Sequence, residues 1–144
     1  MAGFLLDTNV VSELMKKRPN THVLAWVGQT PEPLMHLSVL TIGEVWKGIT
    51  LLADDDPAKV ALQTWLEHDL RIRFAGRLLT FDDGVAERWG RIEALARRRR
   101  STLPTIDAQL AATALHHGLT FATRNTVDVA PTGVSIFNPW LMRG

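Results

Sequence analysis

The chain has 144 residues, of which 46% are hydrophobic and 22% charged, and its formal net charge is +1. This composition predicts one folded domain over residues 1–144, and it excludes a disordered chain and a uniformly basic protein. The absence of cysteine excludes disulfides, thiolate zinc sites and thiol catalysis. No apolar run reaches the roughly 20 residues that span a membrane, and the start lacks the basic segment of a signal peptide. We therefore expect a cytoplasmic protein without a membrane partner.

Hydrophobic periodicity divides the chain into alternating short strands and helices. The predicted elements are a strand at 3–6, helices at 8–17 and 20–28, a strand at 35–39, helices at 41–53 and 57–71, a strand at 77–81, helices at 83–99 and 105–117, and strands at 119–123 and 134–137. Such an alternation is typical of an α/β fold, in which helices cover both faces of a mostly parallel sheet.

Several polar residues are typical of helix ends. Asp7 directly follows the first apolar run and is a candidate N-cap. The segment from Thr41 to Glu44 has the spacing of a capping box, which would begin the helix at about residue 41. His117 and Gly118 match the basic last turn and the glycine that commonly end a helix.

Four oxygen-bearing side chains follow strand-like segments: Asp7, Glu44, Asp107 and Asn125. Because ligands of α/β proteins bind beyond the carboxyl ends of the strands, these side chains are expected to converge. Converging carboxylates repel one another, and a cation relieves that repulsion. A donor set made only of oxygens suits Mg²⁺ or Mn²⁺. The alternative for each acid is a local role at a helix start, where a negative charge is favourable.

Four segments, in this order along the chain, closely resemble the PIN-domain ribonucleases. The segments are Leu6–Glu13, Ser38–Ile49, Pro104–Ala114 and Ala122–Asn125, and Phe137–Trp140 is similar to the ending of one subgroup. The resemblance is closest to the VapC/FitB-type toxins of type II toxin–antitoxin pairs. It implies a PIN-like three-layer α/β/α fold with a short, mostly parallel twisted sheet flanked by helices.

The resemblance implies catalytic and metal-binding roles for the three acids. Asp7, Glu44 and Asp107 match the acidic ligands of Mg²⁺ (or Mn²⁺) in that family. Asn125 lies at the fourth position, where many relatives carry aspartate, and a neutral amide offers an oxygen without charge. Asp128, three residues further on, is a second candidate for completing the site.

Supporting and contact roles follow for five more residues. Thr8 and Asn9 match groups that orient Asp7 or hold water or phosphate; the alternative is that they bond only to backbone. Arg124 is a candidate contact for RNA or a partner, or else a salt-bridge partner of the acids. Arg97 and Arg98, in a run of four arginines, are candidates for the same contacts, or form a solvated helix end.

The function implied by the resemblance is that of a metal-dependent endoribonuclease toxin. A metal-activated water would hydrolyse RNA and leave a 5′-phosphate and a 3′-hydroxyl. The implied partners are a cognate antitoxin that occludes the acidic pocket, and DNA only indirectly, through that antitoxin. A homodimer or a toxin–antitoxin hetero-oligomer in the bacterial cytoplasm is expected.

Three alternatives keep an acidic pocket but differ in activity. A receiver-like Mg²⁺-binding signalling module needs a lysine near its last strand, whereas the four lysines lie between Lys16 and Lys59. A haloacid-dehalogenase-type phosphatase needs an Asp-x-Asp motif, and its third position is Asn9 here. A catalytically inactive PIN fold that serves as a binding module is the third alternative.

Overall fold

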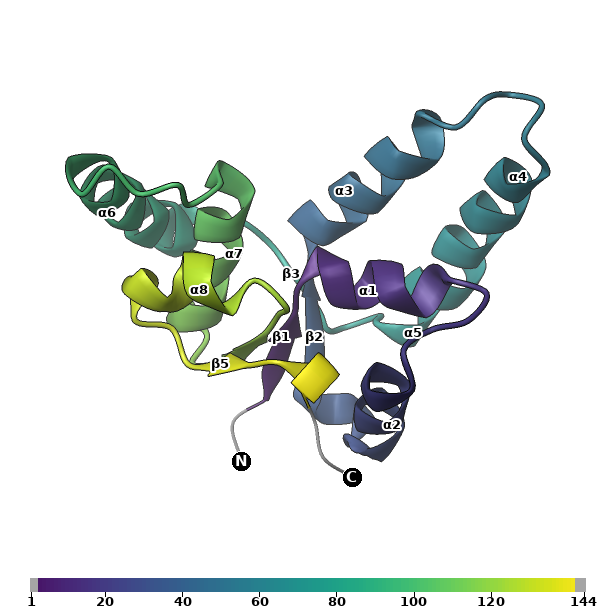
Figure 1. The fold of residues 1–144 in the computed structure, drawn as a ribbon, viewed down its shortest axis with the longest axis horizontal. Coiled ribbons are helices and arrows are strands. Elements are labelled where there is room, and N and C mark those ends of the chain that lie inside the picture. Colours follow the sequence, from purple (N-terminus) through teal and green to yellow (C-terminus); the bar gives the residue numbers. More distant parts are fainter. Residues whose placement is uncertain (1–2, 142–144) are drawn as a thin grey trace.

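The computed structural model describes residues 3–141 and has a five-stranded sheet at its centre (Figure 1). The strands are β1 (Phe4–Leu6), β2 (Met35–Ser38), β3 (Leu78–Leu79), β4 (Thr120–Ala122) and β5 (Ile136–Phe137). They lie in the order β3-β2-β1-β4-β5, and each neighbouring pair is parallel. The predicted α/β class is confirmed.

Helices cover both faces of the sheet, as three layers require (Figure 1). On one face lie α1 (Thr8–Met15), α2 (Thr21–Gln29), α3 (Val39–Thr50), α4 (Pro57–Thr64), the π-helix η2 (Trp65–Leu70) and α5 (Arg71–Arg73). On the other face lie α6 (Asp83–Arg98), α7 (Thr105–His116) and α8 (Thr126–Val129). Short 3₁₀ turns are η1 (Glu32–Leu34), η3 (Ala130–Thr132) and η4 (Pro139–Leu141).

Alternate residues of the central strand supply two separate cores. Leu6 packs with the side chains of α1, α2 and α3, whereas Leu5 packs with those of α7 and α8. Both leucines are almost completely buried. Because successive side chains of a strand point to opposite faces, a short apolar strand can anchor both helical layers. The next residue, Asp7, leaves the strand at its carboxyl end.

The start of α3 differs from the prediction. Ser38, at the end of β2, accepts a hydrogen bond from the backbone N–H of Leu40 at 3.0 Å and caps the helix, which begins at Val39. The capping-box interpretation of Thr41 and Glu44 is therefore wrong. Glu44 lies in the second turn of α3 rather than in the first, so a local capping role does not account for it.

Several other predicted elements differ from the structure in length or in type. The helix predicted at 57–71 contains a π-helical segment at Trp65–Leu70, and the outer strands β3 and β5 have two residues each. Helix α8 was not predicted, because a four-residue helix is too short to show a periodic pattern. Among residues 3–141, no helix is both long and apolar enough to cross a membrane.

Candidate active site

The site lies where two neighbouring strands end. Leu6 of β1 is paired with Ala122 of β4, so the residues that follow them, Asp7 and Thr123, are neighbours beyond the sheet edge. The backbone N–H of Asp7 donates to the carbonyl of Ala122 at 2.9 Å. From β1, the strand order runs outward to β2 and β3 on one side and to β4 and β5 on the other. Ligands of open α/β sheets bind at such a reversal point.

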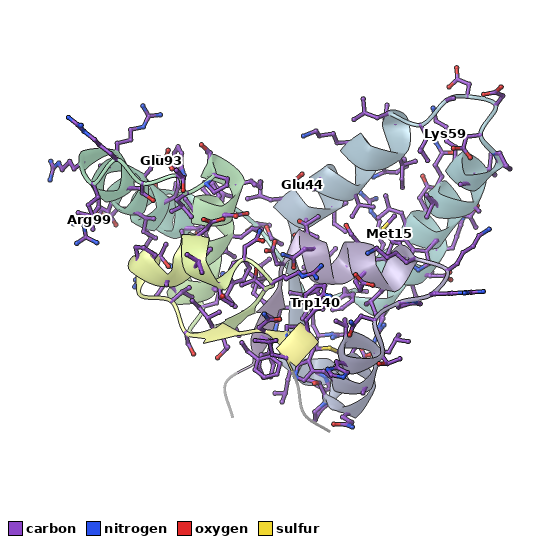
Figure 2. The ribbon with its side chains drawn as sticks, viewed as in Figure 1. Met15, Glu44, Lys59, Glu93, Arg99 and Trp140 are labelled. Atoms are coloured by element: carbon purple, nitrogen blue, oxygen red, sulfur yellow. The ribbon has the colours of Figure 1, made fainter. Side chains whose placement is uncertain are left out.

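A cleft of about 390 Å³ opens at this point. It is lined by Asp7, Thr8, Asn9, Ser12, Glu13, Lys16, Glu44, Asp107, Arg124, Asn125 and Trp140. The structure thus brings together the four predicted oxygen donors, although they come from the end of β1, from α3, from α7 and from the segment after β4. Glu44 reaches the cleft from α3, and Trp140 comes from the C-terminal segment (Figure 2).

Three predicted residues do not line the cleft. Asp128 lies on α8, half-buried. Arg97 and Arg98 lie exposed in the last turn of α6, where Arg97 approaches Glu93 at 3.7 Å. The neighbouring Arg99 marks this outer end of α6 in Figure 2, away from the labelled Glu44 and Trp140. Any contact of this arginine pair with RNA or a partner takes place outside the cleft.

Asp7 is a buried carboxylate with both oxygens bound. Its side chain is 3% exposed; Oδ1 accepts from the N–H of Thr8 at 2.7 Å and Oδ2 from the hydroxyl of Thr123 at 2.6 Å. Burial raises the pKa of Asp7 to about 6, and the negative charges of Asp107 and Glu44 add to the rise against these two hydrogen bonds. The helix-cap prediction for Asp7 is confirmed, and the same residue faces the cleft.

Asp107 is buried with one oxygen unsatisfied. It lies in the first turn of α7, and its Oδ2 has no hydrogen-bond partner among the described residues. Burial raises the pKa of Asp107, the charges of Asp128 and Glu44 add to the rise, and the side chain of Asn125 opposes it. A buried polar atom without a partner costs free energy unless a ligand supplies one.

Thr123 connects the site and was not predicted. It is completely buried; its hydroxyl donates to Asp7 and accepts from the backbone N–H of Asn125 at 3.0 Å and from Nδ2 of Asn9 at 3.3 Å. Thr8 also forms a side-chain bond, from its hydroxyl to that of Thr41 at 3.2 Å. The available signal was that Thr123 is polar and directly follows a buried apolar segment, as Asp7 does.

The cleft is also lined by Glu13, Lys16 and Trp140, for which no role was predicted, and by the predicted Arg124. Glu13 is buried; its Oε1 accepts from Nζ of Lys16 at 2.9 Å and its Oε2 from the N–H of Asn20 at 2.9 Å. The bonds from Lys16 and Asn20 hold the pKa of Glu13 below its ordinary value. The guanidinium of Arg124 lies over the ring of Trp140, 5.1 Å from its centroid.

The donor chemistry fits a hard divalent cation. The converging donors are oxygens, two carboxylates have raised pKa values, and one buried oxygen of Asp107 lacks a partner. Within residues 3–141, however, no group of three or more His, Cys, Asp or Glu side chains is arranged to hold a metal ion. The residues therefore fit an ion bound through one or two carboxylates, with water or phosphate in its other positions, as is usual for Mg²⁺.

Fold and site together define an α/β protein with an acidic cleft at the reversal point of a parallel sheet. The family model for the PIN domain matches residues 4–127. The chain therefore belongs to the PIN-domain family. This membership removes the receiver-like and dehalogenase-type alternatives.

The chain is similar in sequence to named proteins over nearly its whole length. Toxin FitB of Neisseria gonorrhoeae is 38% identical over 136 residues, which are 94% of this chain and 97% of FitB. VapC ribonuclease Y4jK of Sinorhizobium fredii is 34% identical over 139 residues, covering 94% and 96% of the two chains. A solved structure of FitAB bound to the IR36 DNA fragment contains a chain that is 35% identical, with a TM-score of 0.89 and 98% coverage of both chains.

Proposed function

We propose that this chain is an Mg²⁺- or Mn²⁺-dependent endoribonuclease and the toxin of a toxin–antitoxin pair. The observation that carries the proposal is the unpartnered, buried oxygen of Asp107, in the same cleft as Asp7 with its raised pKa. Two buried carboxylates stay ionised near neutral pH most readily when a cation neutralises them. The names of FitB as a toxin and of Y4jK as a ribonuclease support the reaction class.

We assign the ion to Asp7 and Asp107, with Glu44 as the third carboxylate that faces it. A bound divalent ion would supply positive charge for the phosphoryl oxygens and would acidify a water molecule. Asn125 contributes a neutral oxygen inside the cleft, whereas Asp128 acts on the charge of Asp107 from outside it. The products are a 5′-phosphate and a 3′-hydroxyl.

The remaining cleft residues hold this arrangement. Thr8 and Thr123 fix the two oxygens of Asp7, and Asn9 bonds to Thr123. Asn9 also keeps its buried Oδ1 without a protein partner in the described part of the chain, so that oxygen is free to accept from water. In this proposal Thr8 and Asn9 orient the carboxylate that binds the ion.

We propose that the chain acts in the bacterial cytoplasm with three kinds of partner. RNA is the substrate, and an antitoxin occupies the acidic cleft when the enzyme is silent. DNA is reached only through the antitoxin, in agreement with the DNA-bound FitAB structure. Arg124 is a contact for RNA or antitoxin in the cleft, and Arg97 and Arg98 offer a second basic surface. The protein acts as a homodimer or in a hetero-oligomer with its antitoxin.

The test is cleavage of purified cellular RNA by the wild type and by Asp7→Ala, with Mg²⁺ or Mn²⁺ and with EDTA. Asp55→Ala, which removes an exposed carboxylate from the loop before α4, is the matched control. We expect cleavage by the wild type and the control only with metal, and none by Asp7→Ala. Equal cleavage by all three proteins would reveal a contaminating nuclease, and no cleavage by any would favour an inactive PIN-fold binding module.

A further inference from the structure

The position of Arg124 is unusual for a cation beside an acidic site. It is exposed, it lines the same cleft as Asp7, Glu44 and Asp107, and it follows Thr123 directly in sequence. Within residues 3–141, no carboxylate lies within 4.0 Å of its guanidinium, which instead lies over the indole of Trp140. The predicted alternative of a salt bridge to the acidic cluster is therefore not formed in the described part of the chain.

Trp140 is anchored well enough to control where Arg124 lies. Its backbone N–H donates to Oδ1 of Asn138 at 2.9 Å, and its carbonyl lies 3.1 Å from Nδ1 of His22. Its half-buried ring packs against the core cluster on the α1 and α2 side of the sheet. A fixed aromatic face attracts a guanidinium and leaves its N–H groups free to bind an anion.

Of the two cations that line the cleft, Arg124 is the one without an ion pair among the described residues, so its guanidinium can bind an anionic ligand. Lys16, which lines the cleft too, is bound to Glu13 at 2.9 Å. A guanidinium released from the indole would be attracted to the neighbouring carboxylates, because opposite charges in a partly buried cleft interact strongly. Such a pair would compete with the metal ion for Asp7 and Asp107.

We propose that Trp140 is a positioning residue that holds Arg124 as the binding group for an RNA phosphate next to the scissile bond, and that keeps it off the metal-binding carboxylates. The inference rests on the proposed function, since it takes RNA as the ligand. A guanidinium can bind a phosphate through two parallel hydrogen bonds, whereas the acidic end of the cleft repels phosphate without a metal. In this proposal Arg124 binds one phosphate of the strand, and the metal-binding carboxylates act on another in the same cleft.

The experiment compares Arg124→Gln, Trp140→Leu, Trp140→Phe and the double variant Arg124→Gln/Trp140→Leu. Binding of a short, fluorescein-labelled single-stranded RNA of mixed sequence is measured in EDTA, and kcat and KM are measured with Mn²⁺. Arg124→Gln is expected to weaken binding and raise KM about tenfold with little change in kcat, as for a charge-assisted hydrogen bond. For the Arg124→Gln variant, the slope of log K against log salt concentration should be smaller in magnitude by about 0.7, the value for one phosphate contact in a single strand.

Trp140 should act through Arg124. Trp140→Leu is expected to lose as much RNA affinity as Arg124→Gln, whereas Trp140→Phe should retain most of it. The double variant should bind RNA no more weakly than either single variant. Trp140→Leu should also need more Mn²⁺ for half-maximal activity. Adding Arg124→Gln should remove that extra demand, because the released guanidinium is then absent. Arg91→Gln, which neutralises an exposed arginine on α6, is the matched control, and thermal melting verifies that each variant is folded.

Two outcomes would overturn the inference. Wild-type RNA binding by folded Trp140→Leu would show that Trp140 does not position Arg124. Additive losses in the double variant would show that a base stacks on Trp140 directly. Failure of the proposed function is a separate result: the wild type would then cleave no RNA, while the binding measurement in EDTA still reports on Arg124 and Trp140.

Discussion

The two ends of the cleft contain equally buried carboxylates whose pKa values shift in opposite directions. Asp7 and Asp107 are 3% and 6% exposed, and their pKa values are raised. Glu13 is 6% exposed, and its pKa is lowered by Lys16 and the N–H of Asn20. Burial disfavours the charged form of all three acids, and hydrogen bonds outweigh this effect only at Glu13. Glu13 has a cationic partner and a backbone N–H partner, whereas burial dominates at the two aspartates and the charge of Glu44 adds to it.

The opposite pKa shifts distinguish Glu13, which is bonded within the protein, from Asp7 and Asp107, whose negative charges a bound cation would stabilise. A paired acid gains little from an added cation, and an unpaired acidic cluster gains much. Four experiments test the contrast, in order of decreasing expected effect.

The largest difference should appear in catalysis. Asp107→Asn keeps the shape of the side chain but removes the charge that attracts the metal, and we expect kcat to fall at least about a thousandfold. Glu13→Gln, the matched amide substitution at the other end, should change kcat by no more than about twofold. Steady-state cleavage with Mn²⁺ measures both, and a similar loss in the two variants would contradict the contrast.

The pH dependence of stability should have opposite signs at the two ends. In metal-free buffer, folding raises the pKa of Asp7 from 3.8 to about 6, so the folded state holds this proton more tightly than the unfolded state. Protonated Asp7 therefore contributes about 3 kcal/mol to the free energy of unfolding below pH 3.8, and this contribution is lost as the pH rises through about 6. The contribution of Glu13 is present above its ordinary pKa of 4.5 and is lost as the pH falls below it. Urea unfolding of the wild type, Asp7→Asn and Glu13→Gln at a series of pH values measures the two contributions separately. If the free energies of unfolding of the two variants changed with pH in parallel, the pKa values of Asp7 and Glu13 would not be shifted in opposite directions.

Metal binding should stabilise the fold through the aspartates alone. With Mn²⁺ at one hundred times its dissociation constant, the free energy of unfolding should rise by about 2.7 kcal/mol. The rise should persist in Glu13→Gln and disappear in Asp7→Asn. Denaturant titrations with Mn²⁺ and with EDTA give the values. Equal stabilisation of Asp7→Asn by Mn²⁺ would place the ion elsewhere.

A smaller effect is expected from Thr123→Val, which keeps the volume and removes the hydroxyl that donates to Asp7. Residues that orient metal ligands typically contribute a factor of about 10–100 to metal affinity. The concentration of Mn²⁺ for half-maximal cleavage should increase accordingly. Thr120→Val, on the strand β4 that Thr123 follows, loses only a side-chain bond to the exposed Ser135 and is the control. If both valine variants need the same Mn²⁺ concentration as the wild type, Thr123 has no orienting role.

Much of the site was predictable because it follows from where strands end. Asp7, Glu44, Asp107 and Asn125 were placed together from their positions after apolar segments, and all four line one cleft. The local explanation of Glu44 failed, because Ser38 caps α3 and a capping box is only a pattern of residue types. Arg97 and Arg98, singled out for their charge, lie outside the cleft, since a run of charges on a helix does not reveal which surface it faces.

The amino-acid sequence by itself determined the alternation of strands and helices, because apolar periodicity and helix caps are local properties. It also determined which oxygens reach the carboxyl edge of the sheet. Only the tertiary structure decided the contacts inside the cleft, because Thr123 reaches Asp7 across 116 residues of sequence and Trp140 meets Arg124 only after β5 joins the sheet. Packing of elements distant in sequence buries Asp7 and Asp107 and so raises their pKa values, whereas the nearby Lys16 and Asn20 lower the pKa of Glu13.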